Sequence, residues 1–405
     1  MKKLLVLTLA LLMALSSTAF AAVELEFNYW SSEQEAGITA VVDAFNASQD
    51  EIHVTATIVP WDQFWEKLSV GLPAGSAPDV FTINALNVVD YAKNGYLLDI
   101  SDLFESGAVD VSKFPQSAID THTVDGTLWA VPKDYDNIAV YYNKSMFDAA
   151  GVEYPTNDWT WDEFIEIAKQ LTDVDSGIYG AALTPNGQSL VYDYIAGNGG
   201  ELFDEEGNCV VNSPENVEAL TKIAEAFLSG EVCPSVEAMV EIDADTRFQS
   251  GMVAMNFADS WMVAEYVECW GDDLGIVALP VMKEHKTTSH SLGWAAAAST
   301  EHPEEVKTFL TYLGSEEAGE LLSTVVIPAY EGTDTMWSDR YIEYGADVFT
   351  TAAAEGWTVP LPAASNNAAE VYDTFDNYMS EILSSGEVES NLAALQDEIN
   401  ALIAE

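Results

Sequence analysis

Flat aromatic side chains and planar polar side chains stand near the ends of short apolar runs in this sequence. Trp261 and Trp294 are the aromatic examples, and Asn84 and Asn87 are the polar ones. A sugar presents an apolar ring face and a rim of hydroxyl groups, so its site needs a flat aromatic surface and bidentate hydrogen-bonding groups. These residues are therefore candidates for a site of that kind.

Each of these residues also suits a purely structural role. Trp261 and Trp294 have the size and apolar character of core residues, and Asn87 suits the N-cap of a helix. Weaker candidates follow the first expected strand or lie in a loop before a Gly-Gly pair: Ser32, Glu33, Gln188 and Tyr192. Trp61 and Trp357 are further aromatic candidates, for which packing is an equal interpretation.

Motifs of nucleophilic and of metal-dependent catalysis are absent from the sequence. It contains neither Gly-x-Ser-x-Gly nor His-Glu-x-x-His, and its five histidines lack metal-binding spacing. A glycosidase needs two carboxylates across the scissile bond, and no local motif singles out such a pair among the 67 acidic residues. We therefore expect a non-enzymatic protein without cofactor or metal, and keep a glycan-active enzyme as the alternative.

The elements that position these residues follow an alternating pattern. Hydrophobic periodicity predicts strands at 25–29, 52–59 and 80–83, separated by helices at 34–48 and 63–72. This β-α-β-α-β rhythm predicts a parallel sheet covered by helices. Ligands of such sheets bind beyond the carboxyl ends of the strands.

The rest of the chain continues the alternation of strands and helices. Thr160 and Glu163 form a capping-box pattern, and Ser213 with Pro214 is typical of a helix start. Further strands are expected at 138–142 and 252–257, and further helices at 304–313, 316–322 and, in two parts split near 384–386, at 372–403. Neither a repeat nor a low-complexity linker is present, which favours two lobes joined by several short crossings.

Charge and length narrow the class of protein. The 405 residues carry a net charge of −53, which becomes −55 when Lys2 and Lys3 are removed. Phosphate groups repel such a surface, so neither nucleic acid nor an anionic membrane surface is expected as a partner. A chain of about 380 mature residues exceeds one ordinary domain and suggests two.

The N-terminus is typical of a secretory signal. Lys2 and Lys3 precede an apolar run at 4–15, and small residues follow up to Ala22. The run is too short to span a membrane, although a retained anchor helix is the alternative. No cysteine stands directly after this run, where a lipid would be attached. We therefore expect a cleaved signal peptide at 1–22, no lipid anchor, and a periplasmic or extracellular protein. The three cysteines leave open whether Cys209 and Cys233 pair or all three stay unpaired.

Four segments, in a characteristic order, are spread over much of the chain after residue 22. They are WDQFWEKL with APDVF at 61–81, GTLWAVPKDYD with YYNK, AGV and WTWDEF at 126–164, FQSGMVAM with its tryptophan at 248–261, and SLGW with HPEE at 291–305. Together they resemble the extracellular solute-binding family that includes maltose-binding protein. The resemblance implies a monomeric receptor that carries a sugar or oligosaccharide to the membrane subunits of an ABC importer.

The same resemblance implies an α/β, two-lobed periplasmic-binding-protein fold with three interlobe crossings, near Tyr135, Pro280 and Pro328. Lobe I would comprise 23–134 and 281–328, and lobe II 135–280 and 329–405. The lobes would close on the ligand like a hinge.

The resemblance also assigns roles to single residues. Trp261 matches the family's stacking tryptophan, Trp294 stands where the family often contacts its ligand, and Asp136 matches an acidic position at the first crossing. Asp134 and Lys133 are its neighbours, and an ion pair at the hinge is their alternative role. The family's tryptophan–acid pair is absent from the loop at 84–87, so the identity of the ligand stays open. Two rival interpretations remain: a binding protein for another solute such as a polyamine, and a rigid cell-surface lectin.

Overall fold

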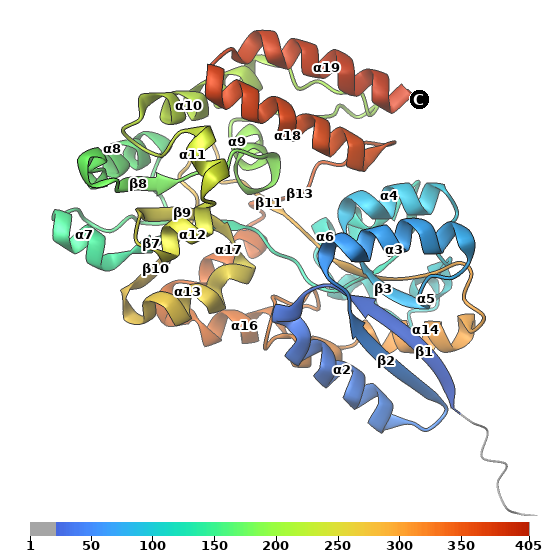
Figure 1. The fold of residues 1–405 in the computed structure, drawn as a ribbon. Helices are drawn as coiled ribbons and strands as arrows, with labels where there is room; N and C mark the ends of the chain where they lie inside the picture. Colours follow the sequence, from blue (N-terminus) through green and yellow to red (C-terminus); the bar gives the residue numbers. More distant parts are fainter. Residues whose placement is uncertain (1–21, 405) are drawn as a thin grey trace, which may run out of the picture.

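The computed structural model describes residues 22–404. Except for Ala22, the predicted signal peptide lies outside these residues. Two α/β lobes lie side by side, each built around its own sheet (Figure 1). Lobe I has a five-stranded sheet of order β2-β1-β3-β12-β6, and lobe II a four-stranded sheet of order β10-β7-β9-β8. The predicted two-lobed fold is confirmed.

Lobe I contains the predicted β-α-β-α-β unit with bounds that differ by at most two residues from the expected ones. Its first three strands are parallel, as expected. The strand β12, which returns from lobe II, and β6 break this pattern because β12 pairs antiparallel with both β3 and β6. The elements of lobe I are β1 (Val23–Tyr29), η1 (Ser32–Gln34), α2 (Glu35–Ser48), β2 (Ile52–Ile58), α3 (Trp61–Ala74), β3 (Val80–Ile83), α4 (Ala85–Lys93), α5 (Ser101–Glu105), α6 (Gln116–Thr121), β4 (Thr123–Val124), β5 (Thr127–Leu128), β6 (Val131–Pro132), β12 (Gly293–Ala296), α14 (Pro303–Leu313) and α15 (Glu316–Leu322).

Lobe II is larger and holds the C-terminal helices, which lie together at one end (Figure 1). The capping box of Thr160 and Glu163 is present, and Ser213 caps the helix that begins at Pro214. Its elements are β7 (Ile138–Asn143), α7 (Lys144–Ala150), α8 (Trp161–Leu171), β8 (Tyr179–Ala182), the π-helix η4 (Gly187–Val191), α9 (Tyr192–Gly197), α10 (Pro214–Ser229), α11 (Val236–Glu241), α12 (Ala244–Gln249), β9 (Val253–Asp259), η5 (Ser260–Met262), α13 (Val263–Trp270), β10 (Leu274–Val277), β11 (Thr287–Ser289), α16 (Asp334–Arg340), α17 (Asp347–Ala354), β13 (Thr358–Pro360), α18 (Ala368–Ser385) and α19 (Val388–Ala404).

Three crossing segments lie side by side between the lobes and are joined by backbone hydrogen bonds. The first, at 133–136, pairs with the second through Asp136 and His290, whose amides donate to each other's carbonyls at 2.8 and 2.9 Å. It pairs with the third on its other edge, where the Tyr135 amide donates to the Ile327 carbonyl at 3.1 Å. The crossings therefore form a short three-stranded ribbon.

The second crossing lies at 290–292 and not near Pro280, which corrects the expected lobe boundary. Residues up to 289 stay in lobe II because β11 pairs with β13, with Thr287 opposite Thr358. The partner strand lies about 70 residues further along the chain, so a local apolar run ending at Pro280 could not reveal it. Lobe I resumes at β12.

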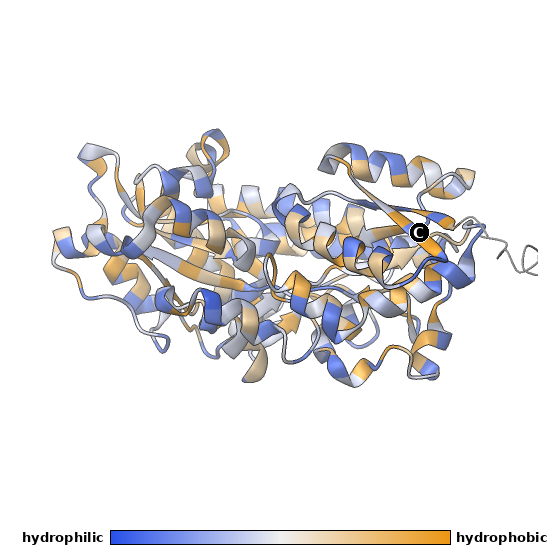
Figure 2. Ribbon diagram, turned by 90° about the horizontal axis from the view of Figure 1, so that it is seen from below, coloured by the Kyte–Doolittle hydropathy of each residue, from blue (hydrophilic) through white to orange (hydrophobic). Residues whose placement is uncertain are grey.

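Apolar residues gather along the strands inside each lobe, and polar residues are frequent on the outer helices (Figure 2). Each lobe has buried hydrophobic clusters of its own. The three cysteines are free, with Cys209 and Cys233 buried and Cys269 exposed, so the possible Cys209–Cys233 bridge is absent. Across residues 22–404, no helix has both the length and the apolar character that a membrane span requires.

Candidate functional site

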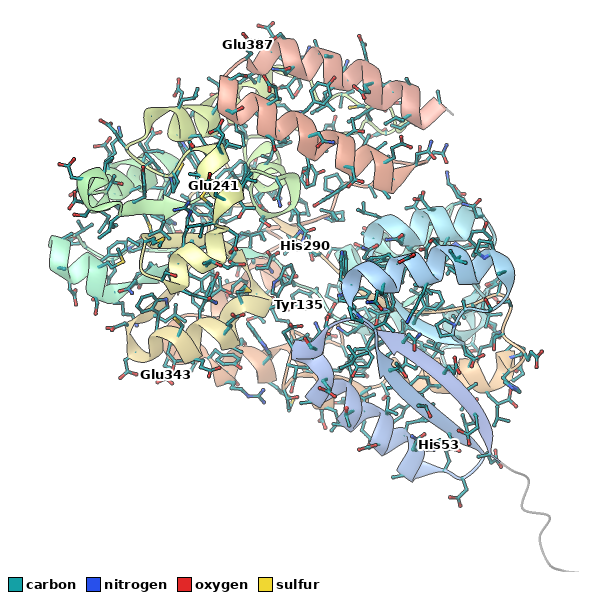
Figure 3. The ribbon with its side chains drawn as sticks, in the orientation of Figure 1. His53, Tyr135, Glu241, His290, Glu343 and Glu387 are labelled. Carbon is teal, nitrogen blue, oxygen red and sulfur yellow. The ribbon has the colours of Figure 1, made fainter. Side chains whose placement is uncertain are left out.

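A cleft of about 600 Å³ lies between the lobes where the strands β1, β3 and β9 end and the crossings begin. Figure 3 shows Tyr135 and His290 at this junction. Eight of the candidate residues named from the sequence line it: Ser32, Glu33, Trp61, Asn84, Asp134, Asp136, Gln188 and Trp261. Its position agrees with the rule that ligands of α/β sheets bind beyond the carboxyl ends of strands.

Trp261 presents an aromatic face to the cleft. It follows β9 in the short turn η5, and 46% of its surface is exposed although it is a large apolar residue. Its ring centroid lies 6.3 Å from that of His290, with the two planes inclined by 40°. An exposed tryptophan at the end of a strand can stack on the apolar face of a sugar ring.

A second aromatic group lines the cleft from lobe I. Trp61, at the start of α3, is 50% exposed, and its ring packs edge-on against Trp30 at a centroid distance of 5.1 Å. Sequence reasoning did not select Trp30, although its position directly after β1 matches the signal that selected Trp261. The cleft therefore has aromatic side chains from both lobes.

Asn84, and not Asn87, is the N-cap residue that was expected in this loop. Asn84 is the N-cap of α4, because its side-chain oxygen accepts from the Asn87 amide at 3.0 Å and from the Asn87 side chain at 2.9 Å. Asn84 lines the cleft, whereas Asn87 does not and serves to hold the Asn84 side chain. Of the pair, only Asn84 stays a candidate for ligand contact.

Lys133 and Asp134 form a buried ion pair at the first crossing. The Lys133 side chain is fully buried and also donates to Gln34 Oε1 at 2.6 Å. Asp134 Oδ1 accepts from the Leu292 amide at 3.0 Å, which ties the first crossing to the second. This arrangement fulfils the alternative role of an ion pair at the hinge, and Asp134 also lines the cleft.

Trp294 and Tyr192 lie in the cores of the lobes and not in the cleft, which corrects their expected roles. Trp294 is 1% exposed and packs edge-on against Phe27 at 5.3 Å. Tyr192 is buried and packs against Phe375 at 4.8 Å. Neither lines the cleft, although Tyr192 lines the neighbouring hollow between the lobes.

Asp136, Asp259 and His290 meet at the floor of the cleft. His290 Nδ1 lies 3.2 Å from Asp259 Oδ1 and 3.7 Å from Asp136 Oδ2, and all three side chains are largely buried. Burial alone would lower the pKa of His290, but the two carboxylates outweigh it and raise that pKa to about 10. Burial, followed by the Asp136 charge, raises the pKa of Asp259 to about 7. Sequence reasoning missed Asp259 and His290 because no local motif marks them.

The cleft has an acidic electrostatic character. No lysine or arginine lines it within the described part of the chain, and the nearby Lys133 is already paired. The exposed carboxylates of Glu33 and Glu265 also line it. An anionic ligand would therefore find no free cation to offset its charge.

Asp193 is a buried acid behind the cleft floor. Its Oδ1 accepts from the Thr288 amide at 2.5 Å, and its Oδ2 has no hydrogen-bond partner among residues 22–404. Burial raises its pKa to about 7. The folded protein therefore holds the Asp193 proton more tightly than the unfolded chain, where an aspartate has a pKa of about 3.9.

This difference predicts a pH-dependent stability. The contribution of Asp193 is fully present below about pH 4 and is lost as the pH rises through about 7. The free energy of unfolding should therefore fall between pH 5 and pH 8. Asp193→Asn should remove a part of this fall on the order of 2–4 kcal/mol, because an amide cannot ionise. Denaturant unfolding at several pH values measures this, with the exposed Asp175→Asn as control. Parallel curves for the wild-type protein and Asp193→Asn would contradict it.

Two α/β lobes, three hydrogen-bonded crossings, and an aromatic and polar cleft between the lobes define the class of two-lobed binding proteins. The chain belongs to the bacterial extracellular solute-binding protein family, whose profile matches residues 29–320.

Individual relatives are distant in sequence. An arabinooligosaccharide-binding protein from Halalkalibacterium halodurans is 27% identical over 287 residues, which cover 68% of this chain and 63% of that protein. An arabinooligosaccharide-binding protein from Bacillus subtilis is 24% identical over 350 residues, or 80% of each chain. The chain thus spans less than two thirds of the length of the first of these relatives.

Solved structures share the fold. An ABC substrate-binding protein from Listeria monocytogenes, in complex with cycloalternan, superposes with a TM-score of 0.85 at 24% identity over 95% of this chain and 99% of that one. A solute-binding protein from Thermotoga lettingae, bound with α-D-tagatose, superposes with a TM-score of 0.80 at 16% identity over 94% of this chain and 100% of that one. At these identities the likeness concerns the fold alone.

Proposed function

We propose that this protein captures an uncharged sugar or oligosaccharide between its lobes and delivers it to the membrane subunits of an ABC importer. The observation that carries the proposal is the pair of aromatic walls, with Trp261 on lobe II and Trp61 on lobe I, around a cleft that also holds carboxylate and amide groups. Rings of a glycan stack on such aromatics while the polar groups bind its hydroxyls.

The size of the cleft supports a glycan of more than one ring. Its volume of about 600 Å³ lies within the range of about 300–1,000 Å³ that accommodates drug-sized ligands. A second hollow of about 640 Å³ shares Ala85 and Leu361 with the cleft and extends it between the lobes. Lys93 lines this hollow, where its ammonium group donates to the Ser365 carbonyl. The two arabinooligosaccharide-binding relatives support the same ligand class.

Export and partners complete the proposal. Residues 1–22 serve as a cleaved signal peptide, and the mature chain works as a monomer outside the inner membrane without a lipid anchor. Its net charge of −55 without Lys2 and Lys3 argues against nucleic acid as a partner. Membership of an extracellular family supports this location.

Thermal melting of the mature chain against a panel of neutral mono- and oligosaccharides tests the function. A sugar present at 100 times its Kd should stabilise the protein by about 2.7 kcal/mol. Calorimetry then gives the affinity and stoichiometry of each hit. If no glycan raises the melting temperature or produces heat, the proposed function is wrong.

A cationic solute such as a polyamine is the second candidate, because the cleft is acidic. Glu33, Glu265 and Asp136 line it without a free lysine or arginine beside them. Spermidine in the same calorimetry separates the two functions. Tight spermidine binding that persists in 0.5 M salt, with no response to any glycan, would favour the polyamine receptor.

A further inference from the structure

We propose that Asp136, Asp259 and His290 form a binding site for a divalent transition-metal ion in the floor of the cleft. One carboxylate oxygen from each aspartate and one nitrogen of the histidine ring lie within 4.8 Å of one another. The three residues come from the first crossing, the end of β9 and the second crossing. Because they are far apart in the sequence, the spacing of the five histidines did not suggest a metal.

The distances between the donor atoms suit a metal ion. Two ligand atoms that each lie about 2.2 Å from a cation, at angles of 90–110°, are about 3.1–3.6 Å apart. His290 Nδ1 lies 3.2 Å from Asp259 Oδ1 and 3.7 Å from Asp136 Oδ2. A cation among these atoms takes the place of the proton that His290 Nδ1 shares with the two carboxylates, so binding releases that proton.

The balance of buried charge supplies an independent reason. Asp193 is also buried, and the charges of both His290 and Asp259 act on it. Three buried acidic side chains thus interact with a single imidazole. Within residues 22–404, Asp193 Oδ2 has no hydrogen-bond partner, and Asp259 Oδ1 makes no well-aligned hydrogen bond although His290 Nδ1 lies 3.2 Å away. Buried carboxylates without partners are costly, and they are normally paired or bound to a metal.

The donor set indicates the kind of ion. One imidazole and two carboxylates suit Zn²⁺ or Mn²⁺ better than a soft metal. Three protein ligands leave at least one position open, as in metal sites that also bind a second ligand. Asp136 and His290 line the cleft beside Trp261. If the proposed function is right, a hydroxyl of the bound glycan can take this open position.

The test uses the mature protein after treatment with a chelator and without any glycan. Calorimetry with Zn²⁺ and, separately, Mn²⁺ is performed in 0.15 M salt with excess Mg²⁺, which saturates weak sites on the acidic surface. We expect one site per chain that binds at least one of the two ions. Its affinity should fall at least tenfold in both Asp259→Asn and His290→Gln. Glu265→Gln, which changes an exposed carboxylate of the same cleft, is the matched control and should bind normally.

A spectroscopic readout distinguishes coordination from general attraction to an acidic protein. Co²⁺ bound by the three residues should give a visible absorption band that is absent in His290→Gln and present in Glu265→Gln. Melting curves in chelator establish that each variant folds, and Asp136→Asn replaces any variant that does not. Equal ion binding by the wild-type protein and folded His290→Gln would overturn the site. Because no glycan is present, that result would leave the sugar-binding function standing.

Discussion

The substitution Trp261→Ala is expected to raise the Kd for the glycan more than tenfold and to change the stability of the ligand-free protein little. The ring is 46% exposed at the end of β9, so its removal leaves the core intact. The variant would lose the contact with the apolar face of the sugar. It would also lose an aromatic contribution of about 0.5–1.5 kcal/mol beyond the area buried in that contact. A tenfold loss corresponds to about 1.4 kcal/mol.

Calorimetric Kd values and melting without ligand measure the two halves of this expectation. Trp261→Phe is the matched variant, because it restores a flat apolar face and should recover part of the affinity. If Trp261→Ala instead unfolds readily while its folded fraction binds the glycan normally, the tryptophan serves the core and the ligand lies elsewhere in the cleft.

Trp294→Ala is expected to lower the free energy of unfolding by about 3–5 kcal/mol, the usual cost of truncating a core tryptophan. The side chain is 1% exposed, packs against Phe27, and lies beneath the Lys133 ammonium group at 5.5 Å from the ring centroid. Denaturant unfolding measures the loss. Trp294→Phe should lose less, because it leaves a smaller cavity.

The two tryptophans form a reciprocal pair of experiments. The folded fraction of Trp294→Ala should retain glycan affinity within about threefold, since the ring does not line the cleft. A stable Trp294→Ala variant that has lost binding would contradict the burial of this residue and return it to the ligand site.

The predictable parts of this fold are those set by neighbouring residues. The parallel unit from β1 to β3 follows from local periodicity, and the starts of α8 and α10 follow from their capping residues. Burial of single side chains depends on distant contacts. Trp261 and Trp294 look alike in sequence, yet one faces the cleft and the other packs on Phe27.

Contacts between distant segments also explain what the sequence could not reveal about the site. The cluster of Asp136, Asp259 and His290 exists only because two crossings and the end of β9 converge. The second crossing lies about ten residues after its predicted position, because β11 pairs with β13, which lies near the C-terminal end of the chain. Patterns in a single sequence carry no information about the convergence of these three side chains or about the pairing of β11 with β13.

The ribbon of three crossings has a mechanical consequence. Strands that are hydrogen-bonded side by side can bend out of their common plane, because such bending leaves the length of each hydrogen bond nearly unchanged. Sliding one strand along another would break the bonds between Asp136 and His290 and between Tyr135 and Ile327. Bending of the ribbon would therefore change the angle between the lobes while the pairing of the crossings holds. The same residues of the two lobes would then face each other across the cleft after every such movement.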